Sequence, residues 1–234
     1  FNLFGVCIFV VVSLLYYPTI IEIANSWSSV GDRYSHGWFI FAITIYLLAK
    51  LPSPRRIAAP TKLITLPLLL GLGSLVYALN IADIDRIQWS LVPLLLILVT
   101  YALLGWDKTK PYIFPFLYLY LGLPVWNFLN PYLQSLTTFT SGLLLSFMNF
   151  PALIEGNFIT IPNGTFQVAG GCSGFKYFIS SLALSLLYAY LYRGSLKNRA
   201  SVIILGVILS LVANWVRVLC LILVGYYEGM DHEL

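Results

Sequence analysis

Charged side chains are scarce in this sequence: aspartate, glutamate, lysine and arginine make up only 9% of its 234 residues. A soluble domain usually carries about a quarter. Hydrophobic residues make up 59%, and the mean hydropathy is +0.87. This composition excludes a soluble globular domain. It predicts an all-α polytopic membrane protein with about seven or eight membrane helices in one integral-membrane domain, residues 1–234.

Cysteine and histidine are also few. The cysteines are Cys7, Cys172 and Cys220, and the histidines are His36 and His232. The cysteines form neither a disulfide framework nor paired zinc-ligand spacing, and two histidines do not make a multi-histidine metal site. We therefore expect no metal and no cofactor. The net charge of +4 indicates loop topology and not nucleic-acid binding.

Apolar runs separated by polar loops predict the membrane segments. They are expected at about 1–21, 38–51, 63–80, 87–104, 111–125, 173–191 and 200–226. Another segment, 131–149, has one polar face, formed by Gln134, Ser135, Thr137, Thr138, Thr140 and Ser141. We interpret it as an amphipathic or re-entrant helix on the outer side of the membrane.

Basic residues gather in the loops at 50–62, 108–110 and 193–199, which the positive-inside rule places in the cytoplasm. The loop that holds Cys172 then lies on the outer side, provided that 111–125 or 131–149 does not cross completely. Just before it, hydrophobic and polar residues alternate on both sides of Asn163-Gly164. This pattern predicts a small outer-face β-hairpin over 153–168, whose edge could bind an extended peptide.

Residues 168–177 read Val-Ala-Gly-Gly-Cys-Ser-Gly-Phe-Lys-Tyr. They place Cys172 at the start of a long apolar helix, where unpaired N–H groups favour negative charge and could hold an oxyanion. Gly170, Gly171 and Gly174 let the backbone and a substrate approach closely. The alternative is a small buried cysteine after a loop, and Cys7 and Cys220 are interpreted as apolar filler.

Arg217 is an ionisable residue inside an apolar helix, which is costly unless the charge is paired or functional. It lies about 27 Å along the helix from Arg199 at 1.5 Å per residue, near the depth expected for Cys172. Asn214 shares its face, and His232 follows on the same side. The alternatives for Arg217 are snorkelling to the interface or a salt bridge with Glu22, Asp32 or Glu155. Asn214 could instead make an interhelical hydrogen bond, and His232 could be an ordinary loop histidine. Together, the thiol, guanidinium and imidazole offer a nucleophile, an oxyanion stabiliser and an acid/base.

The sequence resembles the exosortase/archaeosortase family, the membrane-embedded cysteine transpeptidases. The resemblance rests on Gly-Cys-Ser-Gly-Phe-Lys-Tyr at 171–177, Asn-Trp-Val-Arg-Val at 214–218 and Asp-His-Glu at 231–233. It extends to Tyr-Ser-His-Gly at 34–37 and to the approach from Asn163-Gly164 to Val168. The sequence begins at Phe1 inside an apolar run and stops two residues after His232, so we expect both ends of the natural protein to be missing here. Family members usually continue past the histidine into a further membrane helix.

The resemblance implies that Cys172, Arg217 and His232 are catalytic. Gly171, Ser173, Gly174 and Asn214 are expected to support the oxyanion or orient the reacting groups. The shared motif around His36 suggests a substrate-binding or structural role.

The resemblance also implies a substrate and a location. Family members cleave C-terminal sorting signals built from a short motif (Pro-Glu-Pro in bacterial substrates), an apolar span and a basic cluster. They act through a cysteine acyl-enzyme, which an amine or lipid acceptor of the cell envelope, or water, resolves. We expect a multi-pass protein of the cytoplasmic membrane, with its active site on the outer face. Sorting signals and membrane lipids are the expected partners, nucleic acid is not, and bacterial genes of this kind often accompany exopolysaccharide production.

Two other interpretations remain. A non-enzymatic transporter or exopolysaccharide-export component would use Arg217 and Asn214 to line a substrate path, but two related halves with broken helices are not evident. Another intramembrane hydrolase would need a Ser/Asp dyad or a His-Glu-x-x-His motif, and the latter is missing.

Overall fold

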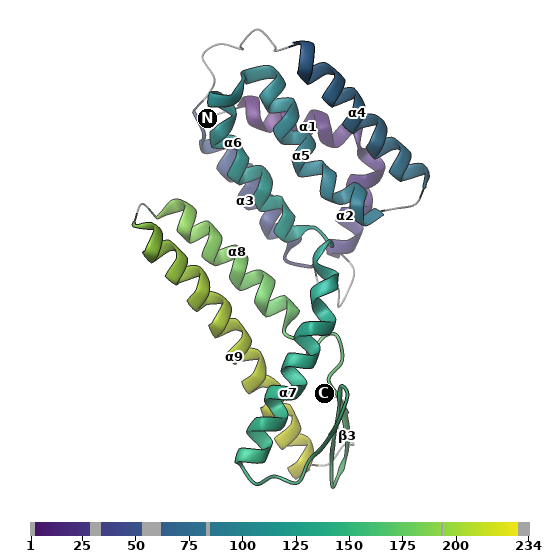
Figure 1. Ribbon diagram of the computed structural model, residues 1–234, viewed down its shortest axis with the longest axis vertical. Helices are drawn as coiled ribbons and strands as arrows, with labels where there is room; N and C mark the ends of the chain where they lie inside the picture. The colour runs from purple at the N-terminus through teal and green to yellow at the C-terminus, as the bar shows by residue number, and fades with distance from the viewer. Residues whose placement is uncertain (1–2, 29–33, 53–61, 83–84, 193, 229–234) are drawn as a thin grey trace. The chain divides into compact units, whose positions relative to one another are not determined.

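The computed structural model describes residues 3–28, 34–52, 62–82, 85–192 and 194–228, and most of them are helical (Figure 1). Two described helices, Ile87–Leu104 and Leu196–Tyr227, are long and apolar enough to cross a membrane. Trp106–Gly122 and Trp126–Phe147 form a third candidate when counted together, and several shorter helices are apolar as well. A mostly helical membrane protein with a small antiparallel sheet is therefore confirmed, while the number of seven or eight spans stays a prediction.

The chain forms two compact units, Phe1–Val125 and Trp126–Leu234. The first unit contains α1 (Leu3–Leu15), α2 (Tyr17–Ser28), α3 (Gly37–Lys50), α4 (Lys62–Ile81), α5 (Asp85–Leu104), α6 (Trp106–Tyr118) and the 3₁₀ turn η1 (Leu119–Gly122). The single helix expected over 1–21 is wrong, because α1 and α2 meet at Tyr16. Pro18 has no N–H to donate to the carbonyl four residues earlier, and this interrupts the helical hydrogen bonds.

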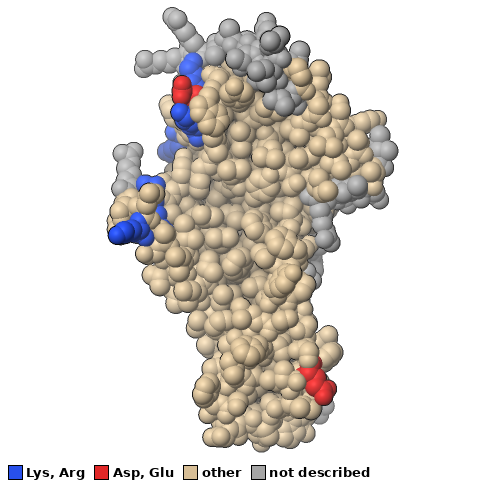
Figure 2. Space-filling model, in the orientation of Figure 1, with Lys and Arg blue, Asp and Glu red and all other residues tan. Residues whose placement is uncertain are grey.

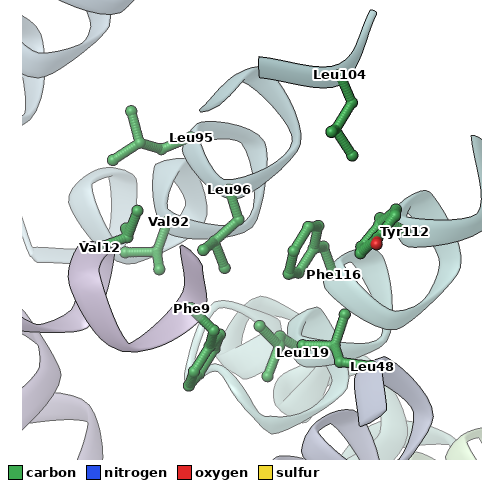
Figure 3. Close-up of a cluster of buried hydrophobic side chains, with 10 residues drawn as sticks. All are labelled: Phe9, Val12, Leu48, Val92, Leu95, Leu96, Leu104, Tyr112, Phe116 and Leu119. Atoms are coloured by element: carbon green, nitrogen blue, oxygen red, sulfur yellow. The ribbon is translucent and has the colours of Figure 1, made fainter. Parts of the chain in front are cut away.

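The core of the first unit brings α1, α3, α5, α6 and η1 together. Its buried side chains are Phe9, Val12, Leu48, Val92, Leu95, Leu96, Leu104, Tyr112, Phe116 and Leu119. Phe116 is completely buried and lies in the middle of this cluster (Figure 3). Close packing of aliphatic and aromatic side chains therefore unites helices that are far apart in sequence.

Side chains at the end of α2 and the start of α3 hold the carbonyl groups of η1. Trp27 Nε1 donates to the Gly122 carbonyl at 2.7 Å. His36 Nε2 lies 2.9 Å from the Leu121 carbonyl and must donate, because a carbonyl only accepts. A Cβ atom on Gly37 would lie 2.2 Å from Trp27 Nε1. Glycine at position 37 is therefore what lets the indole reach η1.

The second unit contains the turn η2 (Trp126–Leu129), α7 (Asn130–Phe147), β1 (Leu153–Glu155), β2 (Phe158–Ile161), β3 (Gly164–Gln167), α8 (Phe175–Leu191) and α9 (Leu196–Glu228). The strands form an antiparallel sheet in the order β1-β2-β3. The hairpin is confirmed, but its register pairs Ile161 with Gly164, so the turn residues are 162 and 163. A third strand, β1, joins it through a turn at Gly156, whose φ is +58°.

The polar face of α7 points into the protein. Thr137, Thr138 and Ser141 are at most 1% exposed. The opposite stripe is apolar and exposed, and consists of Tyr132, Leu136, Phe139, Leu143 and Phe147. The expected amphipathic pattern is therefore present: the helix turns most of its polar face to protein and its apolar face outward, the arrangement expected where lipid is the solvent.

Helices α8 and α9 form an antiparallel hairpin with small residues where they meet. Ser181 Oγ donates to the Gly206 carbonyl at 2.6 Å, and a Cβ atom on Gly206 would lie 2.1 Å from Ser185 Oγ. On the face of the second unit that Figure 2 shows, basic atoms lie at the end where α8 and α9 join, acidic atoms lie at the sheet end, and uncharged side chains cover the surface between them. This distribution is typical of a membrane-embedded unit.

Gly37→Ala is expected to lower the free energy of unfolding by about 1–3 kcal/mol, because the new methyl group overlaps the Trp27 indole. The midpoint of thermal unfolding in detergent would report the change, at about 2–4 °C per kcal/mol for a chain of this size.

Gly71→Ala is the matched control, since a Cβ atom there meets nothing within 4 Å. It should leave the midpoint unchanged or raise it slightly, because alanine favours a helix by about 1 kcal/mol over glycine. Equal losses in both variants would contradict the role assigned to Gly37.

Candidate functional site

Cys172 lies in a turn between the sheet and α8. Its N–H donates to the Ala169 carbonyl at 2.9 Å, which closes the turn. The helix begins at Phe175, after Gly174 in the left-handed region with φ +84°. The cysteine therefore precedes the helix and is not part of its first turn. Its side chain is half-buried.

Three side chains from α7 and α9 donate to carbonyl groups of this segment. Asn214 Nδ2 donates to the Cys172 carbonyl at 3.0 Å, and Thr137 Oγ1 donates to the Ser173 carbonyl at 3.1 Å. Gln134 Nε2 donates to the Val168 carbonyl. Asn214 Nδ2 also lies 3.3 Å from Thr137 Oγ1, which joins the two helices. Residues on both sides of the cysteine are thus fixed to α7, and the cysteine itself is fixed to α9.

These hydrogen bonds also orient the N–H groups of the turn. A trans peptide is planar, with its C=O and N–H pointing in opposite directions. Because the Cys172 and Ser173 carbonyls point to Asn214 and Thr137, the N–H groups of Ser173 and Gly174 point away from them. The Cys172 N–H is already used in the turn. The N–H groups of Ser173 and Gly174 are therefore the ones that the hydrogen bonds from Asn214 and Thr137 orient.

The Ser173 side chain points inward and is completely buried. Its Oγ lies 2.6 Å from Asn130 Oδ1 and 2.8 Å from the Gly170 carbonyl, and one hydroxyl hydrogen serves one of these acceptors at a time. It also accepts the Phe175 N–H at 3.3 Å, which satisfies a donor at the start of α8. Ser173 therefore stabilises the turn from within.

Gly174 allows α9 to approach the turn. A Cβ atom at this position would lie 2.8 Å from Asn214 Nδ2 and 2.9 Å from Asn214 Cγ. Its positive φ independently favours glycine. Asn214 itself is completely buried, and its Oδ1 has no hydrogen-bond partner among the described residues.

The Cys172 side chain packs against an apolar cluster beneath the sheet. This cluster consists of Leu145, Ile159, Ile161, Val168, Val218 and Ile222. Arg217 lies elsewhere on α9, exposed, with its guanidinium carbon 6.0 Å from the centre of the Tyr177 ring. The structure therefore brings Asn214 to the cysteine backbone, while Arg217 faces a neighbouring surface.

That surface is an open groove of about 780 Å³ between α8 and α9. Gly171, Lys176 and Arg217 line one end of it. The rest is lined by Tyr177, Ser180, Ser181, Leu184, Gly206, Leu209 and Ser210. Gly171 belongs both to the groove and to the turn that holds Cys172, so the groove ends beside the candidate nucleophile.

The two histidines are placed differently. His36 belongs to the first unit, where it donates to the Leu121 carbonyl, a structural contact. His232 lies outside the described residues, so its predicted role stays a prediction. In the described part of the chain, no group of three or more His, Cys, Asp or Glu side chains could hold a metal ion.

Sequence reasoning missed the residues of α7 that hold the turn, namely Asn130, Gln134 and Thr137. The polar face of this segment was visible in the sequence and was the signal that could have revealed them. The sequence shows this face but not its partner, and in the structure it binds the backbone and the Ser173 side chain around Cys172.

The family model described as transmembrane exosortase matches residues 27–234. The match covers most of the chain and includes Cys172, Asn214, Arg217 and His232, so it confirms the resemblance seen in the sequence. No curated protein and no solved structure matches the chain.

Gly174→Ala is expected to destabilise the protein more than Gly156→Ala. Both glycines have a positive φ, which costs an alanine about 1–2 kcal/mol. Only at Gly174 does the added methyl group also meet another side chain, Asn214, which adds about 1–3 kcal/mol. Thermal midpoints of the two variants in detergent give the comparison, and equal losses would show that the approach of Asn214 imposes no constraint.

Proposed function

The chain belongs to the transmembrane exosortase family, and we propose that it cleaves C-terminal sorting signals of exported proteins through an acyl-enzyme on Cys172. Family membership implies a transmembrane enzyme that processes sorting signals of the PEP-CTERM type, and members are generally cysteine transpeptidases. The observation that supports the proposal most strongly is the hydrogen bond from Asn214 to the Cys172 carbonyl. It connects the family's cysteine and asparagine-arginine motifs directly.

In the proposed first step, the Cys172 thiolate attacks the scissile carbonyl carbon of the substrate and forms a tetrahedral intermediate. The Ser173 and Gly174 N–H groups would donate to its oxyanion, and Arg217 would supply positive charge at the same oxygen. Preorganisation favours this step, because the hydrogen bonds from Asn214 and Thr137 already hold the peptide groups in place.

In the proposed second step, His232 protonates the leaving amine, and the intermediate collapses to a thioester. The same imidazole then takes a proton from an incoming amine or water, which attacks the thioester and releases the thiolate. Transfer to a cell-envelope acceptor and hydrolysis differ only in this second nucleophile.

The proposed location is the outer face of the cytoplasmic membrane. Lys197 and Arg199 lie at the start of α9, and the Cys172 turn lies at the other end of α8. The positive-inside rule places the basic end in the cytoplasm. The turn, the sheet and Glu155 would then face outward, where exported substrates arrive.

Cleavage should depend on Cys172, Arg217 and His232. A reporter ending in Pro-Glu-Pro, an apolar span and a basic tail is co-expressed with the full-length gene, and the loss of its tail is followed by blotting. We expect Cys172→Ala to reduce cleavage by at least about a thousandfold, Arg217→Ala by about 10²–10³-fold and His232→Ala by about 10²–10⁴-fold.

Cys220→Ala is the matched control for this assay, because Cys220 is an exposed cysteine on α9. It should cleave the reporter at the wild-type rate. Cleavage that persists in Cys172→Ala would show that the cysteine is not the nucleophile, and the central proposal would be wrong.

Labelling with a membrane-impermeant maleimide tests the proposed orientation. In intact cells, the reagent should modify Cys172, and the signal should disappear in Cys172→Ala but persist in Cys7→Ala and Cys220→Ala. The latter two thiols are exposed on apolar helices, where a polar reagent in water does not reach them. Labelling that requires rupture of the membrane would overturn the orientation.

A further inference from the structure

The groove between α8 and α9 has two chemically different parts. Near the Cys172 turn it is lined by the cations Lys176 and Arg217, and none of the described residues that line it is acidic. Farther along, its walls are apolar or small, with Leu184, Leu209 and Gly206 among them. Its ideal ligand is therefore an apolar segment that carries negative charge at one end.

Two of the serine hydroxyl groups that line the apolar part, those of Ser181 and Ser210, already donate hydrogen bonds within the hairpin. Ser181 Oγ donates to the Gly206 carbonyl at 2.6 Å, and Ser210 Oγ donates to the Val207 carbonyl at 2.7 Å. Because their hydrogens are used within the hairpin, these serines act as small residues that let another chain approach closely.

Lys176 is placed where a cation is locally unfavourable. It is the second residue of α8, and the first turn of this helix holds no acidic residue. The N-terminus of a helix carries partial positive charge, which attracts anions and repels cations. A lysine here conflicts with the local preference, and such conflicts tend to mark functional positions. It also adds to the attraction that the N-terminus of α8 exerts on an anion.

The length of the groove fits the start of a membrane span. From Arg217 to Gly206 along α9 is about 16 Å at 1.5 Å per residue. This is about half of the hydrocarbon thickness of a bilayer. A substrate helix lying there would be covered over its first three turns, with its preceding residues at the level of the Cys172 turn.

From these observations we propose that the groove binds the sorting signal, with the acidic residue before its apolar span paired to Lys176 and the span lying between α8 and α9. The proposal rests on the proposed function, because it takes the substrate to be a sorting signal. Lys176 would determine specificity for the acidic residue, which leaves Arg217 for the reacting carbonyl.

A charge exchange tests the pairing. Lys176→Glu should reduce cleavage of the Pro-Glu-Pro reporter by about tenfold or more, because it places like charges together. It should in turn favour a Pro-Lys-Pro reporter, which the wild type cleaves poorly, whereas Lys176→Arg should keep the wild-type preference. An unchanged preference in Lys176→Glu would overturn the pairing.

Disulfide cross-linking detects binding of the reporter in the groove without requiring cleavage. A Cys172→Ala, Cys7→Ala, Cys220→Ala protein receives one new cysteine and is oxidised in membranes with a reporter that carries one cysteine in its apolar span. Ser180→Cys, in the groove, should cross-link to the reporter. Val212→Cys is the matched control, exposed on α9 but outside the groove. Lys176→Glu should weaken the Ser180→Cys cross-link for the acidic reporter and restore it for the basic one.

The two assays separate the two proposals. If cleavage depends on Cys172 but Ser180→Cys and Val212→Cys cross-link equally, the proposal that the groove binds the sorting signal is wrong. The enzymatic proposal would still stand. If only Ser180→Cys cross-links but cleavage survives Cys172→Ala, the groove binds the sorting signal and Cys172 is not the nucleophile. Cross-linking at neither position, as expected if a lipid fills the groove, would also overturn the groove proposal.

Discussion

The backbone of the Cys172 turn belongs to neither helix nor sheet, so its carbonyl groups need donors from side chains. Leaving a buried carbonyl without a partner costs about as much as a lost hydrogen bond. Gln134, Thr137 and Asn214 meet this need. The inward polar face of α7, the glycine at 174 and the buried asparagine on α9 all follow from this one constraint.

The sheet is attached to the same frame at the far end of α9. Asn163 Nδ2 donates to the Tyr226 carbonyl, and the Phe166 ring lies where a Cβ atom on Gly225 would be. Phe150 packs edge-on against Tyr226, with ring centroids 4.6 Å apart. Helix α9 therefore contacts both the hairpin and the Cys172 turn, which gives the segment between β3 and α8 a defined conformation.

Hydropathy predicted where most helices lie, and the Asn163-Gly164 alternation predicted the hairpin, because both signals are local. The break at Pro18 was not predictable from proline alone, since Pro67 and Pro93 lie inside α4 and α5 without ending them. Tertiary contacts decide whether a proline ends a helix. The inward direction of the α7 polar face was missed for a similar reason: periodicity reveals a face but not its neighbour. His232 lies outside the described residues, so its role stays a prediction from the sequence.

The arrangement on α9 explains why Gly171 matters in the proposed reaction. Asn214 and Val218 are four residues apart and face the turn and its apolar cluster, whereas Arg217 points to the groove. The Cys172 turn therefore lies beside one face of α9 while the guanidinium lies on another, and in the proposed reaction the scissile peptide would lie between them. Gly171 lines the groove next to the cysteine, and a Cβ atom there would meet nothing within 4 Å. In the proposed reaction, this open space would let a substrate reach the thiol from the groove.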